Sequence, residues 1–151
     1  MFTTVRYFIK TSILFLLLGV FAGIYASVSE YIFGVGVSPE FVSAHTHIIL
    51  VGSVMMMIMG VALWFFPRPE KDDKRYNPDR ITVVYWIMAI STGARFILQI
   101  TDSFLILVPL QWLMTAASVF QGIGMLLFFY SIWGRIRAVG SQYREAKGEK
   151  F

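Results

Sequence analysis

Four long runs of apolar residues, separated by shorter segments, make up most of the chain. The runs extend over residues 8–26, 39–66, 81–100 and 109–133. A helix of this length can cross a hydrocarbon core about 30 Å thick. The strands of a membrane barrel would alternate apolar and polar residues, and a stretch such as GSVMMMIMGVALWFF shows no alternation. The pattern therefore predicts an all-α integral membrane protein with four transmembrane helices.

The composition supports this prediction. Hydrophobic residues make up 57% of the 151 residues, and the mean hydropathy of +0.67 is too high for a water-soluble domain of this length. The chain has no cysteine, which excludes disulfides, thiolate metal sites and haem attached through thioether bonds. We expect residues 1–134 to form one transmembrane domain and residues 135–151 to form a charged cytoplasmic tail.

The basic residues lie on one side of the predicted membrane segments. Of the 13 Lys and Arg residues, all except Arg95 precede the first run or lie near its start, fill the segment 67–80 or follow the fourth run. The outer loops at 27–40 and 101–108 contain none. Since cytoplasmic loops are rich in Lys and Arg, both termini and the segment 67–80 are predicted to be cytoplasmic. Topology thus explains the net charge of +4, and no nucleic-acid partner is expected.

The second run begins with a helix-start signal, in which Ser38 is the N-cap, Pro39 the first helical residue and Glu40 an acid in the first turn. His45 and His47, the only histidines in the chain, then lie about 9 to 12 Å from the outer end of the helix. They are separated by about 200° around the helix and cannot bind the same metal ion or haem from one helix.

Two interpretations of the histidines are open. Each ring can simply hydrogen-bond a neighbouring helix. Alternatively, the pair has a function, because burying ionisable groups at membrane depth is costly and imidazole is a common ligand of metals and haem.

A resemblance favours the second interpretation. Residues 45–67, HTHIILVGSVMMMIMGVALWFFP, resemble the haem-ligating H-x-H helix of the catalytic subunit of heme-copper oxidases and nitric oxide reductases. In that family the first histidine binds the high-spin haem and the second binds the low-spin haem, both toward the outer side. The resemblance implies that His45 and His47 ligate haem b in a membrane cytochrome of a respiratory chain. It also implies the inner membrane of a bacterium or archaeon.

The family's catalytic subunit is larger, with about twelve helices in three similar arcs, so this chain corresponds to one arc of four. It lacks the further histidines that hold copper in the family. We expect copies of the chain to close into a ring, in which His47 of one copy and His45 of the next share a haem. A trimer is favoured, while a dimer or pairing with a different haem subunit stays open.

Three further residues are assigned to the haem site. Gly52, seven residues after His45 and on the same face of an α-helix, would leave room for a flat macrocycle, or else permits close helix packing. Arg95 is expected to bind haem propionates, as arginines do in the family, or to form a salt bridge with Asp102. Gln121 is expected to hydrogen-bond a histidine, a propionate or another helix.

Three functions stay open. The first is an electron-transfer cytochrome b that takes electrons from quinol or passes them to another respiratory subunit. The second is a haem-free structural or assembly subunit of a respiratory complex. The third is binding or turnover of nitric oxide or oxygen at a five-coordinate haem, by an oxidoreductase without the usual copper site. A channel or transporter is least favoured, because no run shows a row of polar residues.

Overall fold

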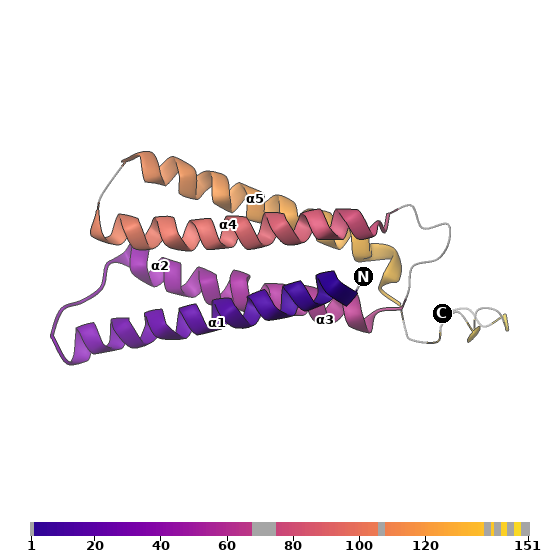
Figure 1. Cartoon of the computed structure of the whole chain (residues 1–151), viewed down its shortest axis with the longest axis horizontal. Helices are drawn as coiled ribbons and strands as arrows, with labels where there is room; N and C mark the ends of the chain where they lie inside the picture. Colours follow the sequence, from indigo (N-terminus) through magenta and orange to yellow (C-terminus); the bar gives the residue numbers. More distant parts are fainter. Residues whose placement is uncertain are drawn as a thin grey trace.

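The computed structural model describes residues 2–67, 75–105 and 108–137, and residues 140, 143, 144, 147 and 148 of the tail. The main elements of this part of the chain are helices (Figure 1): α1 Phe2–Tyr31, α2 Pro39–His47, η1 Ile48–Met55, α3 Met56–Phe65, α4 Pro78–Phe104, α5 Val108–Ile132 and η2 Trp133–Arg135. Three basic residues of the segment 67–80 and much of the predicted tail lie outside the described residues.

The prediction of four transmembrane helices is confirmed. The four segments Thr3–Tyr31, Pro39–Phe65, Pro78–Phe104 and Pro109–Arg135 are long and apolar enough to cross a membrane. Large apolar side chains remain exposed along all of them, including Trp64, Trp112 and Trp133 near helix ends, where tryptophans meet a bilayer interface. These apolar surfaces indicate a lipid bilayer environment and a multi-pass membrane protein.

The second membrane helix consists of α2, η1 and α3 in direct succession. Ser38 caps its start, because the side-chain oxygen accepts a hydrogen bond of 3.2 Å from the backbone N–H of Phe41. Phe66 is extended before Pro67 and ends the helix. The middle part, Ile48–Met55, is a π-helix rather than an α-helix. Its wider turns change the direction in which every later side chain points relative to His45.

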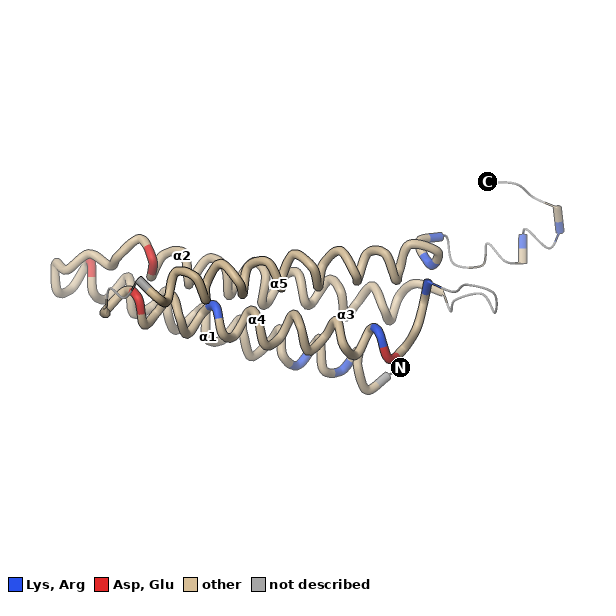
Figure 2. The backbone as a smooth tube through the Cα atoms, turned by 90° about the horizontal axis from the view of Figure 1, so that it is seen from above, with Lys and Arg blue, Asp and Glu red and all other residues tan. Residues whose placement is uncertain are grey.

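The basic residues are concentrated at one end of the bundle, as Figure 2 shows. Apart from Arg95, the described Lys and Arg residues gather at the end of the bundle that holds both termini. Glu30, Glu40 and Asp102 belong to the opposite helix ends. We call these the basic end and the acidic end.

The four helices pack most tightly toward the basic end. There the rings of Phe8 on α1 and Phe128 on α5 meet edge to face at 6.3 Å, within a core that also contains Met59, Leu63 and Met88. Toward the acidic end, α2 packs mainly on α4, while α5 packs on α4 and contacts the other helices little. The helices thus open toward the end that carries the histidines.

Arg135 joins two helices at the basic end. Its fully buried guanidinium donates to the carbonyls of Leu63, Phe66 and Pro67 at 2.8–3.0 Å, and so caps the end of α3. It also lies 4.7 Å from the ring of Tyr76, whose pKa is raised by burial although Arg135 acts in the opposite direction. Arg135, expected at the start of the tail, therefore belongs to the packed bundle.

Candidate functional site

His45 is anchored to α1. Its Nδ1 lies 2.9 Å from the carbonyl oxygen of Gly19. A methyl group at Gly23, one turn further along α1, would lie only 2.9 Å from Cε1 of the imidazole. The ring therefore rests against α1 in a space that glycine at position 23 leaves open. Because a carbonyl can only accept, Nδ1 carries the proton in this arrangement, and in the neutral ring the lone pair is on Nε2.

His47 is anchored to its own helix and, through it, to α4. Its Nδ1 lies 2.9 Å from the carbonyl oxygen of Ser43 and 3.3 Å from the hydroxyl oxygen of the same residue. That hydroxyl accepts a 2.9 Å hydrogen bond from Nε2 of Gln99 on α4. The carbonyl again requires the proton on Nδ1. The two rings thus make different contacts: His45 bonds α1, whereas His47 bonds Ser43 of its own helix, which in turn bonds α4.

Both histidines are half-buried. In both, the hydrogen bond to a carbonyl places the proton on Nδ1. In the described residues, neither Nε2 atom has a hydrogen-bond partner, and neither is a fully buried unpaired atom. This is the tautomer that a histidine ligand needs when it binds iron through Nε2. The described part of the chain contains no cluster of three or more His, Cys, Asp or Glu residues. Each ring is thus suited to provide one ligand to a cofactor that brings its own further ligands.

Gly52 does not lie beside His45 as expected. A methyl group at Gly52 would lie 2.8 Å from Cδ2 of Phe15 on α1 and 3.0 Å from Cγ2 of Thr92 on α4. The expectation assumed an α-helix between residues 45 and 52, whereas the π-helical turns of Ile48–Met55 lie between them and change the rotation from one residue to the other. The space next to it is filled by Phe15 and Thr92. Gly52 permits close helix packing here, the second of its two expected roles.

Arg95 and Gln121 contact each other between α4 and α5. The Nη1 atom of Arg95 donates to Oε1 of Gln121 at 3.3 Å, and Nε2 of Gln121 donates to the hydroxyl of Thr92 at 3.0 Å. In the described residues Arg95 thus bonds Gln121 and not Asp102. Its Nε atom is buried without a partner there. Asp102, expected in an outer loop, is instead a buried residue of α4 with 7% of its surface exposed.

A polar row on α4 was missed by the sequence analysis. Thr92, Arg95, Gln99 and Asp102 follow one another at spacings of three, four and three residues, which places them on one face of the helix. Thr92, Gln99 and Asp102 are buried. The apolar residues between them hide the row when residues are read in order, and only the helical spacing reveals it.

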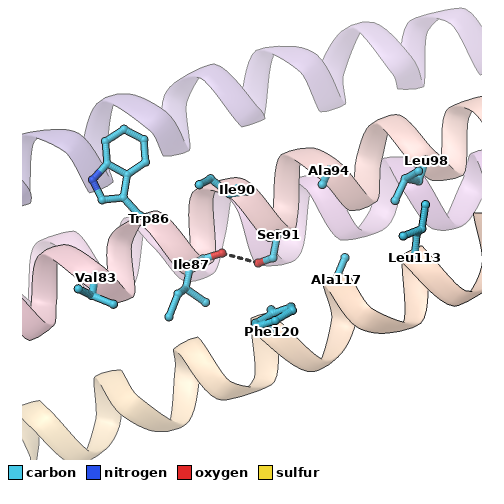
Figure 3. Close-up of a pocket in the computed structure, with 10 residues that line it drawn as sticks. All are labelled: Val83, Trp86, Ile87, Ile90, Ser91, Ala94, Leu98, Leu113, Ala117 and Phe120. Carbon is cyan, nitrogen blue, oxygen red and sulfur yellow. Dashed lines mark hydrogen bonds between the residues drawn. The ribbon is translucent and has the colours of Figure 1, made fainter.

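A groove of about 510 Å³ lies between α4 and α5 and is lined almost entirely by apolar side chains (Figure 3). Its one hydroxyl, that of Ser91, donates to the carbonyl of Ile87 at 2.6 Å and is thereby satisfied. Neither histidine lines the groove. It therefore offers no group for chemistry, and the candidate site remains the two histidines with the polar row of α4.

No protein-family model, curated protein or solved structure matches this chain. The resemblance of residues 45–67 to the haem helix therefore stays a prediction.

Proposed function

We propose that the protein is a membrane b-type cytochrome that binds haem b through Nε2 of His45 and His47 and transfers electrons in a respiratory chain. One observation carries the proposal: both rings, in an apolar helix, direct Nδ1–H to a carbonyl and keep the lone pair on Nε2 unused. Metal-bound histidines almost always donate their other N–H in this way, which fixes the ring and raises its basicity. The bound haem would supply one-electron chemistry at its iron.

Arg95 and Gln121 suit the propionates of a haem near His47. Arg95 is four residues before Gln99 on the same face of α4. Gln99 donates a hydrogen bond to Ser43, whose carbonyl accepts from His47. The guanidinium has a buried Nε that lacks a partner among the described residues, which indicates a place for an acceptor. A propionate carboxylate is such an acceptor, and paired hydrogen bonds from arginine would hold it. Gln121 would orient the guanidinium.

The proposal includes an oligomer, because one chain offers each haem a single histidine. A ring of identical subunits would bring His47 of one copy toward His45 of the next, with the same two surfaces used at each interface. A trimer is favoured over a dimer. The basic end would face the cytoplasm, with both termini, in the inner membrane of a bacterium or archaeon. Quinol or another respiratory subunit would exchange electrons with the haem.

The test is an absorption spectrum of the purified protein in detergent, oxidised and reduced, with haem and protein quantified in one sample. We expect the reduced bands of a b-type haem at about one haem per chain in the proposed ring, and their loss in His45→Gln and His47→Gln. Thr46→Val is the matched control, because in the described part of the chain this exposed hydroxyl bonds only the carbonyl of Val42 on its own helix. Wild-type protein that stays colourless after haem is supplied contradicts the proposal.

Mixed oligomers test the sharing of haem between copies. In a mixture of His45→Gln and His47→Gln chains, an interface that receives its two histidines from different variants has both ligands. Co-expression of the two variants should therefore restore part of the six-coordinate spectrum that each variant lacks alone. If haem is instead bound within one copy, the mixture stays the sum of the two variants. Carbon monoxide binding to the wild type would reveal an open iron position and favour gas binding over electron transfer.

A haem-free structural subunit is the second candidate function. The bond from His45 to Gly19 favours it, because this bond joins α1 to α2 as a purely structural histidine would. In that case the protein is colourless, and His45→Gln lowers its thermal stability while changing no spectrum.

A further inference from the structure

We propose that Gln99 is a positioning residue for His47: its amide holds the Ser43 hydroxyl beside the imidazole as a second acceptor, next to the Ser43 carbonyl, and thereby favours the tautomer that exposes the Nε2 lone pair. The contacts themselves do not depend on haem, whereas the consequence for a bound haem rests on the function proposed above.

Three contacts carry the inference. Gln99 on α4 donates from Nε2 to the hydroxyl oxygen of Ser43 at 2.9 Å. That oxygen lies 3.3 Å from Nδ1 of His47, and the Ser43 carbonyl lies 2.9 Å from the same nitrogen. The N–H of His47 therefore faces two oxygens of one residue. With the amide bonded to it, the hydroxyl is held at this position instead of rotating freely.

The burial of Gln99 indicates that its amide is not there for stability alone. Only 6% of the residue is exposed, and its Oε1 is buried without a partner in the described part of the chain. A buried unpaired carbonyl costs free energy that a leucine at this position would avoid. Buried polar atoms are normally hydrogen-bonded, and exceptions to this rule are expected at functional sites. The hydrogen bond that the amide does make is to the hydroxyl of Ser43, the residue whose carbonyl accepts from His47.

The two histidines are consequently held in different ways. His45 bonds a backbone carbonyl of α1, which no side-chain substitution removes. His47 depends in addition on a hydroxyl and an amide, which evolution or mutagenesis can change. More or stronger acceptors on Nδ1–H make an imidazole a more basic ligand. Gln99 would therefore act on the bound iron through His47, without changing the hydrogen bond that holds His45.

The first experiment needs no haem. Histidine ¹⁵N NMR of the detergent-solubilised apoprotein reports the tautomer of each ring, and the chain supplies only two histidines. In the wild type we expect the Nδ1–H form for both. In Gln99→Leu the Nε2–H form of His47 should rise at least twofold, while His45 serves as the internal control. Ser43→Ala removes the same contact from the other side and should act in the same direction, which covers the case that Gln99→Leu does not fold.

Thr101→Val is the matched control, because among the described residues this hydroxyl of α4 bonds only the carbonyl of Ile97 on its own helix. It should leave both histidine signals unchanged. If His47 keeps its tautomer in both Gln99→Leu and Ser43→Ala, the inference is wrong, whether or not the protein binds haem.

The second experiment uses the haem-loaded protein. A less basic His47 favours the ferrous form, so Gln99→Leu should change the ratio of reduced to oxidised haem three- to tenfold at a fixed potential, about 30 to 60 mV upward for one electron. An unchanged or lowered midpoint potential contradicts the inference, while a protein without haem contradicts only the proposed function.

Discussion

Replacing Gly23 with alanine should displace His45 without disturbing the rest of the site. The added methyl group would lie 2.9 Å from Cε1, 3.5 Å from Nδ1 and 3.6 Å from Nε2 of the imidazole. Carbon atoms in contact prefer about 3.5–4.0 Å, so the ring or α1 must move by about 0.6–1.1 Å. Either movement lengthens the 2.9 Å bond from His45 to Gly19 beyond the range of a hydrogen bond.

The size of the effect follows from this lost bond. A neutral hydrogen bond contributes about 0.5–1.5 kcal/mol, or roughly two- to tenfold in an equilibrium constant. For a residue that orients a metal ligand, measured losses of affinity are about 10- to 100-fold. If His45 ligates haem, Gly23→Ala should therefore weaken haem binding by about tenfold. Helix content should stay unchanged, because alanine favours helix over glycine.

The assay is a titration of haem into the apoprotein in detergent, followed by absorption, beside a thermal melt of the same samples. Gly122→Ala is the matched control, since a methyl group there meets no atom within 4 Å. It should keep wild-type affinity. If Gly23→Ala also binds haem as the wild type does, while ¹⁵N NMR shows His45 in its original tautomer, the argument that α1 positions this ring is refuted.

Three further predictions concern stability and topology. Arg135→Met should lower the free energy of unfolding in a detergent melt, because three carbonyls at the end of α3 lose their donor, at about 1–3 kcal/mol for each that stays unpaired. Gly60→Ala should destabilise by about 1–3 kcal/mol, and Gly124→Ala by less, because Gly60 meets Cβ of Phe8 whereas Gly124 meets a flexible methionine. Tyr31→Cys and Tyr143→Cys replace exposed residues in a chain without other cysteines. The two thiols should react with a membrane-impermeant reagent from opposite sides of the membrane.

The sequence predicts the four membrane helices well because their signal is strong and local. Each run is long and continuously apolar, so the length criterion alone identifies it, and the Ser38 cap is visible as a short motif. The separation of His45 and His47 around the helix also follows from spacing, since both lie in the α-helical part before the π-helix.

The surroundings of the histidines could not be predicted in the same way. The π-helix at Ile48–Met55 has no sequence signature, and neither have the contacts that Phe15 and Thr92 make at Gly52. The polar row of α4 is hidden among apolar residues, and its partners Ser43 and Gln121 come from other helices. Contacts between helices depend on rotation and tilt, which a single sequence does not fix.

The packing of the second membrane helix against α1 shows why a motif on one helix is not a complete site. Glycines lie on both sides of this interface: those of α1, Gly19 and Gly23, accept side chains from the second helix, and Gly60 of the second helix accepts Phe8 and Ile9 of α1. In a membrane the hydrophobic effect does not drive helices together, and small residues instead allow the close packing that stabilises their association. His45 is one of the side chains seated in this way. Its geometry is therefore decided by residues about 22 to 26 positions away, and a chain that kept the H-x-H motif but lost these glycines would keep the histidines without the orientation of His45.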